Sequence, residues 1–112
     1  ADLATQEKYF PMIKEALKDG KVDKESFALL EDRMNLRQGK KQIYGSQISM
    51  DPKTKNYYVR PLEDPDNVDK RRAEVGLQPL ADYVFIWNIT WNIEQYKKDL
   101  PEIEKREKTK NE

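Results

Sequence analysis

Apolar side chains recur at helical spacing in two stretches of the first forty residues. In residues 3–17 they fall on one broad face, and Asp2 is a suitable N-cap for a helix there. Pro11 should kink or divide this helix, and Gly20 is placed to end it. A second helix is expected to begin after Asp23. The apolar stripe of this second helix comprises Phe27, Leu29, Leu30 and Met34. Together the two stretches predict a helical hairpin.

The periodicity changes after Gly39, which should end the second helix. Residues 42–48 and 57–59 have the composition of two short strands, and residues 51–56 between them are rich in turn-forming side chains. Pro61 should end the second strand. A small two-stranded antiparallel hairpin is therefore predicted. Because an isolated hairpin is marginally stable in water, it is expected to pack on the helices.

The last third predicts a short helix and then a longer, aromatic one. The short helix is expected to start after Asp66 or Asn67 and to stop at Gly76. The longer helix should begin at Pro79 and break at Pro101, which leaves residues 101–112 as a charged tail. The predicted fold class is α+β and mostly helical, with a single domain over residues 1–100.

The predicted C-terminal helix is apolar on more than one face over residues 83–93. A helix with so wide an apolar surface is usually packed between two partners, and this chain offers little to cover it. We therefore expect part of the surface to contact another protein subunit or an upstream part of the same chain. The candidate interface residues are Tyr83, Phe85, Ile86, Trp87, Ile89 and Trp91.

Composition narrows the function classes. The 112 residues carry 21 basic and 21 acidic side chains, and this balance argues against a nucleic-acid partner. Histidine and cysteine are both absent, so the commonest general base, thiolate nucleophiles and cysteine–zinc sites are excluded for this sequence. No cofactor or metal is predicted, because the acidic run at Asp64, Asp66 and Asp69 has no calcium-loop glycine or glutamate.

No apolar run reaches the length of a membrane helix. The sequence does not distinguish a cytoplasmic protein from one that is exported after removal of a signal peptide.

The polar segment that runs from the end of the second predicted helix through most of the first predicted strand, residues 32–47, is the candidate ligand-binding region. It combines a charged pair with neutral hydrogen-bonding side chains and two glycines. If it is extended, alternation places one set of its side chains on each face. A structural polar network and a binding site explain this composition equally well. The candidates are Asp32, Arg33, Gln42, Tyr44, Ser46 and Gln47, together with Arg71 and Arg72 on the following short helix.

The order and spacing of several short motifs resemble an uncharacterised bacterial domain family. These motifs are the Asp32–Arg33 pair, the Gly-x-x-Gln-x-Tyr-Gly-Ser-Gln run from Gly39 to Gln47, and a Val-Asp-x-Arg-Arg-x-x-x-Gly-Leu-x-Pro-Leu-x-x-Tyr run from Val68 to Tyr83. Ser46 stands where the family usually has threonine. The resemblance implies an upstream segment that contains histidine, so that this chain would be the C-terminal portion of a larger domain. It implies no reaction.

Two functional hypotheses follow. The first is a non-catalytic binding or interaction domain that docks through the aromatic helix. The alternative is a hydrolase or transferase for a small polar substrate, with Asp32 as base, Arg33 as anion clamp, and Tyr44 or Ser46 as hydrogen-bond donors. If an upstream segment is missing, Leu3 and Phe10 in the first helix, and Ile86 and Ile89 in the last, should expose apolar surface.

Overall fold

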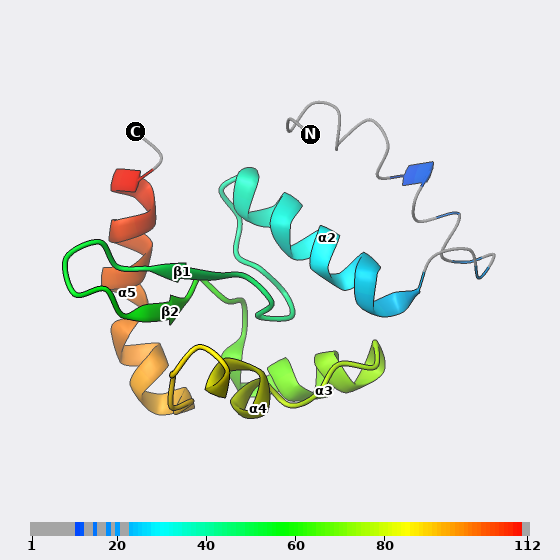
Figure 1. Cartoon of the computed structure of the whole chain (residues 1–112). Coiled ribbons are helices and arrows are strands. Elements are labelled where there is room, and N and C mark those ends of the chain that lie inside the picture. The colour runs from blue at the N-terminus through cyan, green and yellow to red at the C-terminus, as the bar shows by residue number, and fades with distance from the viewer. Residues whose placement is uncertain (1–10, 13–14, 16–17, 19, 21–22, 111–112) are drawn as a thin grey trace.

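The computed structural model describes residues 11–12, 15, 18, 20 and 23–110, and its arrangement is α+β and mostly helical, as predicted (Figure 1). The first predicted helix, including Leu3 and Phe10, lies outside the described residues. The described elements are α2 (Lys24–Arg37), β1 (Ile48–Met50), β2 (Tyr57–Val59), the 3-10 turn η1 (Pro65–Asn67), α3 (Val68–Glu74), α4 (Leu80–Phe85) and α5 (Ile93–Lys110).

The second predicted helix is confirmed as α2. Asp23 caps it by accepting a hydrogen bond from the Ser26 backbone N–H at 2.8 Å, and this bond is the main cause that lowers the pKa of Asp23. After the helix ends, Gly39 adopts a φ of 79°, which favours glycine. The buried face differs from the predicted stripe, because Leu29 is 38% exposed while Asp32 is fully buried.

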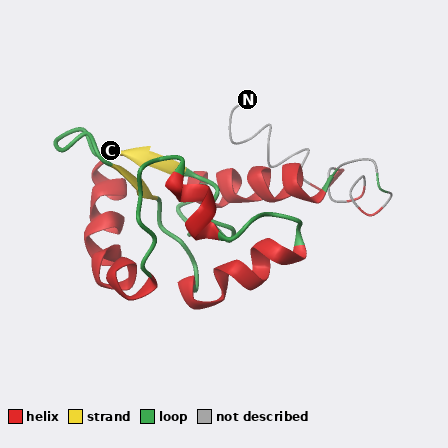
Figure 2. Cartoon of the chain, turned by 60° about the horizontal axis from the view of Figure 1, so that its bottom comes forward, coloured by secondary structure: helices red, strands yellow, loops and turns green. Residues whose placement is uncertain are grey.

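The predicted hairpin is confirmed, but the first strand was predicted to span residues 42–48, whereas β1 is Ile48–Met50. β1 and β2 pair antiparallel, with Ser49 opposite Tyr58 (Figure 2). Residues 42–47 do not extend β1; they curve away, and Gln42 forms only an isolated bridge with Leu62. The physical reason is that backbone N–H groups of this segment bind the Asp32 side chain, as described below.

The predicted long aromatic helix is wrong in its boundaries. α4 ends at Phe85, and Asn88 then adopts a left-handed conformation with φ 65°. Asn92 starts α5 by accepting a hydrogen bond from the Gln95 backbone N–H at 2.9 Å. Pro101 does not break this last helix but lies inside it. The apolar segment is therefore divided by a turn, and the charged tail is helical to Lys110.

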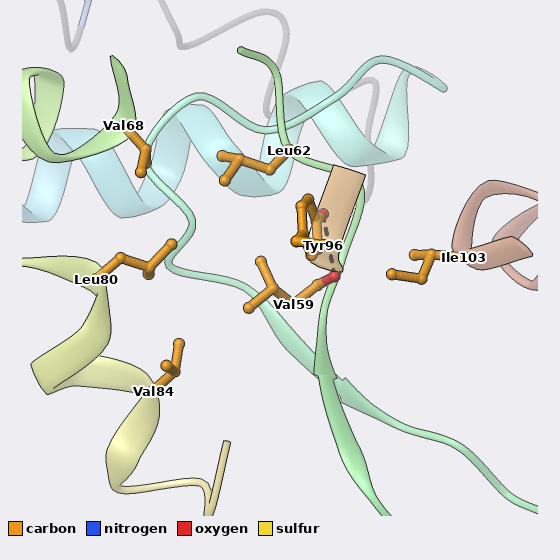
Figure 3. Close-up of a cluster of buried hydrophobic side chains, with 7 residues drawn as sticks. All are labelled: Val59, Leu62, Val68, Leu80, Val84, Tyr96 and Ile103. Carbon is orange, nitrogen blue, oxygen red and sulfur yellow. Dashed lines mark hydrogen bonds between the residues drawn. The ribbon is translucent and has the colours of Figure 1, made fainter. Parts of the chain in front are cut away.

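The core lies between the hairpin, α3, α4 and α5. In Figures 1 and 2, α5 lies beside the hairpin, while α3 and α4 close the opposite side. Figure 3 shows the buried side chains converging from these elements, with the Tyr96 hydroxyl directed to the Val59 carbonyl at 3.2 Å. Burial raises the pKa of this tyrosine well above its ordinary value. The cluster comprises Val59, Leu62, Val68, Leu80, Val84, Tyr96 and Ile103.

Polar contacts fasten the end of α5 to the hairpin. The buried Glu107 carboxylate accepts hydrogen bonds from Arg60 Nε at 2.7 Å and from the Tyr58 hydroxyl at 2.6 Å. Burial, followed by the hydrogen bond and charge of Glu107, raises the pKa of Tyr58 to about 12. Arg106 adds an ion pair with Asp51 at 3.4 Å. These contacts explain why α5 continues beyond Pro101.

Gly45 is expected to tolerate no side chain. Its φ is 73°, and an added Cβ would lie 3.1 Å from a Leu80 methyl carbon. We expect Gly45→Ala to lower the free energy of unfolding by about 2–3 kcal/mol, from left-handed strain and the Leu80 contact. Gly39→Ala is the matched control, because Gly39 has a φ of 79° and nothing within 4 Å of an added Cβ. If urea denaturation shows the same loss of unfolding free energy for Gly45→Ala and Gly39→Ala, the Leu80 contact contributes nothing.

Candidate functional site

Asp32 organises the segment that the sequence nominated as a ligand site. Its side chain is completely buried. Oδ1 accepts hydrogen bonds from the backbone N–H groups of Ile43 at 2.8 Å and Tyr44 at 2.9 Å. Oδ2 accepts from the Ser46 backbone N–H at 3.0 Å and from the Ser46 hydroxyl at 2.7 Å. Since a carboxylate offers about four acceptor positions, all of them are occupied from within the protein.

Gln42 performs a similar role at the start of the segment. Its buried amide Nε2 donates to the Gln47 carbonyl at 3.1 Å and the Arg60 carbonyl at 2.9 Å. Its Oε1 accepts from the Gln47 backbone N–H at 2.9 Å. The side chain thus joins both ends of residues 42–47, which we call the polar loop, to the hairpin.

Two arginines of α3 bind the carbonyl groups of the polar loop. Arg71 Nε donates to the Ile43 carbonyl at 2.8 Å, and its NH1 donates to the Asp64 carbonyl at 3.0 Å. The buried Arg72 donates to the Tyr44 and Gln78 carbonyls, and its guanidinium lies 5.0 Å from the ring centre of Tyr83. Burial is the main cause that lowers the pKa of Arg72.

The backbone of the polar loop is satisfied almost completely by these side chains. Tyr83 donates its hydroxyl to the Ser46 carbonyl at 2.8 Å, and Gln42 exchanges backbone hydrogen bonds with Pro61 and Glu63. Gly45 is the one position of the loop for which no backbone hydrogen bond is described. An irregular segment can be this deeply placed only if its polar groups are paired. The side chains therefore replace the bonds that a strand would make.

The remaining ligand candidates lie apart from one another. Arg33 lies on the exposed face of α2, and its guanidinium has no hydrogen bond or ion pair with any described residue. Tyr44 is half-buried, and burial followed by the charges of Glu31 and Asp32 raises its pKa. The Gln47 amide donates to the Ser46 hydroxyl at 3.0 Å. Arg33, Gln42 and Tyr44 line neither of two surface depressions, one between α2 and α5 and one beside β2 and the start of α5.

This geometry gives the enzyme hypothesis no support from Asp32. A general base needs a free acceptor position within hydrogen-bond reach of a substrate proton. Asp32 is buried and bound to four internal donors, and Ser46 is bound to Asp32. Within the described residues no group of three or more acidic side chains is placed to hold a metal ion. The polar network can fix a loop, and the four donors that bind Asp32 leave its carboxylate no free acceptor position for a substrate.

The six interface candidates divide into two sets. Phe85 and Ile86 are 77% and 73% exposed. Ile89 and Trp91 are half-buried and pack against the core, as does Tyr83. Trp87 is half-buried, and its ring centre lies 5.1 Å from that of Tyr57.

Exposed apolar side chains of the hairpin and of the end of α4 are linked by one ring contact. The Trp87 ring packs at a tilted angle of 60° against Tyr57, and Tyr57 is the cross-strand partner of Met50, so Tyr57 and Met50 lie on one face of the hairpin. Tyr57 and Met50 are exposed, as are Phe85 and Ile86, which directly precede Trp87 in the chain. We call Met50, Tyr57, Phe85, Ile86 and Trp87 the apolar patch.

Sequence reasoning missed two structural residues, Asp69 and Glu107. Asp69 accepts a hydrogen bond from the Leu80 backbone N–H at 2.8 Å and so fixes the start of α4. No periodicity marks this role. Glu107 does have a signal, because Tyr96, Leu100, Ile103 and Glu107 recur at helical spacing and are the positions of α5 that face the core and hairpin.

The chain belongs to a family of unknown function, DUF6624, whose model matches residues 1–95. Comparison with curated proteins and with solved structures found no match. The matched residues contain the whole polar loop with Asp32, Arg71 and Arg72, and the apolar patch. None of the described helices is long and apolar enough to cross a membrane.

Proposed function

We propose that this member of the family is a non-catalytic interaction domain that binds another protein subunit through the apolar patch. The observation that carries the proposal is the exposure of Phe85 and Ile86, at 77% and 73%. They are adjacent, apolar and large, in a chain with 38% charged residues. Clustered exposure of this kind marks interaction surfaces on soluble proteins.

The patch is held rigidly, which favours binding. After α4, the Ile86, Trp87 and Asn88 backbone N–H groups donate to the Tyr83, Val84 and Phe85 carbonyls. The Ile89 N–H donates back to the Val84 carbonyl at 3.1 Å, and Val84 itself is completely buried. Because the turn is ordered before a partner arrives, little backbone entropy is lost when it binds.

The polar loop supports the same proposal, because its side chains have structural roles. Asp32, Gln42 and Arg72 are buried, and their polar atoms bind the loop backbone. All three side chains lie within the motifs on which the sequence comparison drew. Their hydrogen bonds give each of them a structural role that needs no substrate.

Size-exclusion chromatography with light scattering, combined with a photo-crosslinker at position 85, tests the proposal. We expect either a mass above 13.3 kDa that falls to the monomer value in Phe85→Ser/Ile86→Ser, or one discrete crosslinked partner. The matched control places the crosslinker at Lys53, which is exposed at the hairpin tip. A monomer at all concentrations, with no adduct specific to position 85 in extracts of cells that make the protein, would contradict the proposal.

A further inference from the structure

A second surface feature lies away from the apolar patch, between the end of α2 and the last turns of α5. It is a depression of about 690 Å³, a size within the usual range for small-molecule sites. Its residues come from α2, the turn that follows, the segment after β2, and α5. They are Leu36, Gly39, Lys40, Lys41, Pro61, Glu104, Glu107 and Lys108. None of them belongs to the apolar patch.

The charges that line the depression do not cancel within the described part of the chain. Lys41 pairs with Glu104 at 3.3 Å, and Glu107 is neutralised by Arg60 at 2.7 Å. Lys40 and Lys108 are exposed, and neither ammonium group has a hydrogen bond or ion pair with a described residue. The uncompensated charge of the depression is therefore positive and comes from two ammonium groups on different elements, one on the turn after α2 and one on α5.

The base of the depression is apolar. Leu36 and Pro61 are both buried, yet both line it. Gly39 adds backbone without a side chain, and nothing lies within 4 Å of the position its Cβ would take. A ligand that matches both features needs an anionic group for the lysines and an apolar body for Leu36 and Pro61, because such sites combine apolar walls with a few polar groups that fix orientation.

We propose that this depression binds a small amphiphilic carboxylate, an organic acid whose carboxylate lies between Lys40 and Lys108 and whose apolar body rests on Leu36 and Pro61. The inference does not depend on the proposed protein–protein contact, because the two surfaces share no residue. Lys40 and Lys108 supply charge without a rigid hydrogen-bond geometry, which suits a small anion at a partly open site.

Sodium octanoate is the first probe, added to the isotope-labelled full chain and followed by amide chemical shifts. We expect saturable shifts at Leu36, Gly39, Lys40, Lys41 and Lys108. Two further probes separate the parts of the recognition: octanamide keeps the apolar body without the charge, and inorganic phosphate has the charge without the body. Both should bind at least about tenfold more weakly than octanoate. Equal binding of either would overturn the proposal.

Charge reversal at the two lysines gives the second arm of the test. Lys40→Glu/Lys108→Glu should raise the octanoate dissociation constant about tenfold or more, because it replaces two charges that attract the carboxylate with two that repel it. The matched control is Lys53→Glu/Lys55→Glu, which reverses two exposed charges at the hairpin tip and should leave binding unchanged. Binding that is unsaturable, unaffected by the lining variant, or centred on Phe85 and Ile86 would contradict the assignment.

Discussion

Replacement of Asp32 by alanine should lower the free energy of unfolding by about 3–5 kcal/mol. The substitution leaves three backbone N–H groups and the Ser46 hydroxyl without their acceptor. Each buried donor left unpaired costs about 1–3 kcal/mol, and partial relaxation of the loop reduces the sum. Urea denaturation followed by circular dichroism measures the loss. Few single substitutions in this chain should have a larger effect.

The neighbouring residue provides the control. Arg33 is exposed and has no hydrogen bond or ion pair with a described residue, so Arg33→Ala should change stability by less than about 0.5 kcal/mol. The stability loss of Asp32→Asn should lie between those of Asp32→Ala and Arg33→Ala. The amide keeps one acceptor oxygen but places a donor where a second acceptor is needed. Equal stability of Asp32→Ala and Arg33→Ala would show that the polar loop does not depend on the carboxylate.

Leu80→Ala should be the second large effect, with a loss of about 2–5 kcal/mol. Leu80 is completely buried in the core, and its methyl carbons lie 3.1 and 3.2 Å from the position that a Cβ on Gly45 would take. Its removal leaves a cavity between α4 and the polar loop. Leu29→Ala is the matched control, because Leu29 is 38% exposed and should lose less than about 1 kcal/mol.

The same site allows a test of coupling between the loop and α4. In the Leu80→Ala background, the added methyl group of Gly45→Ala occupies space that the leucine has vacated. We therefore expect the double variant to lose less stability than the two single losses added together. Strict additivity, measured by urea denaturation, would mean that the loop and α4 do not contact each other as described.

Local signals in the sequence predicted the elements with clear start and stop residues. Asp23 and Gly39 bounded the second helix correctly, and the turn residues between the strands predicted the hairpin. The aromatic segment was predicted as a single helix from its apolar side chains, and its two asparagines were not considered as turn or cap residues. Asn88 is left-handed and Asn92 caps α5, so the two residues build a turn.

Pro101 misled the prediction of the last helix. A proline removes one helical hydrogen bond, here to the carbonyl of Lys97, and both residues are exposed, so water can bind that carbonyl. Tertiary contacts then outweigh the loss. Glu107 binds Arg60 and Tyr58 across forty-seven and forty-nine positions of the chain, a separation that no local pattern reveals.

The polar loop shows why a site nominated by composition can be a structural element. The sequence nominated Asp32, Gln42, Ser46, Arg71 and Arg72 as ligand-binding residues, and in the structure these side chains meet around one segment of the backbone. The sequence could not show that these side chains form their hydrogen bonds within the chain. The predicted alternation of side chains between two faces does not occur in the polar loop. Gly45 is left-handed, and Asp32 binds successive N–H groups of the curved loop.

Amide hydrogen exchange at Ile43, Tyr44 and Ser46 tests most directly whether Asp32 holds the loop. Their N–H groups bind the buried carboxylate, so exchange should be slow in the wild-type chain and in Arg33→Ala. In Asp32→Ala the three amides should exchange much faster than amides of α5, even under conditions where the protein stays folded. Exchange in the wild-type chain as fast as in an unfolded peptide would contradict the account, because the carboxylate would then be free to act in another role.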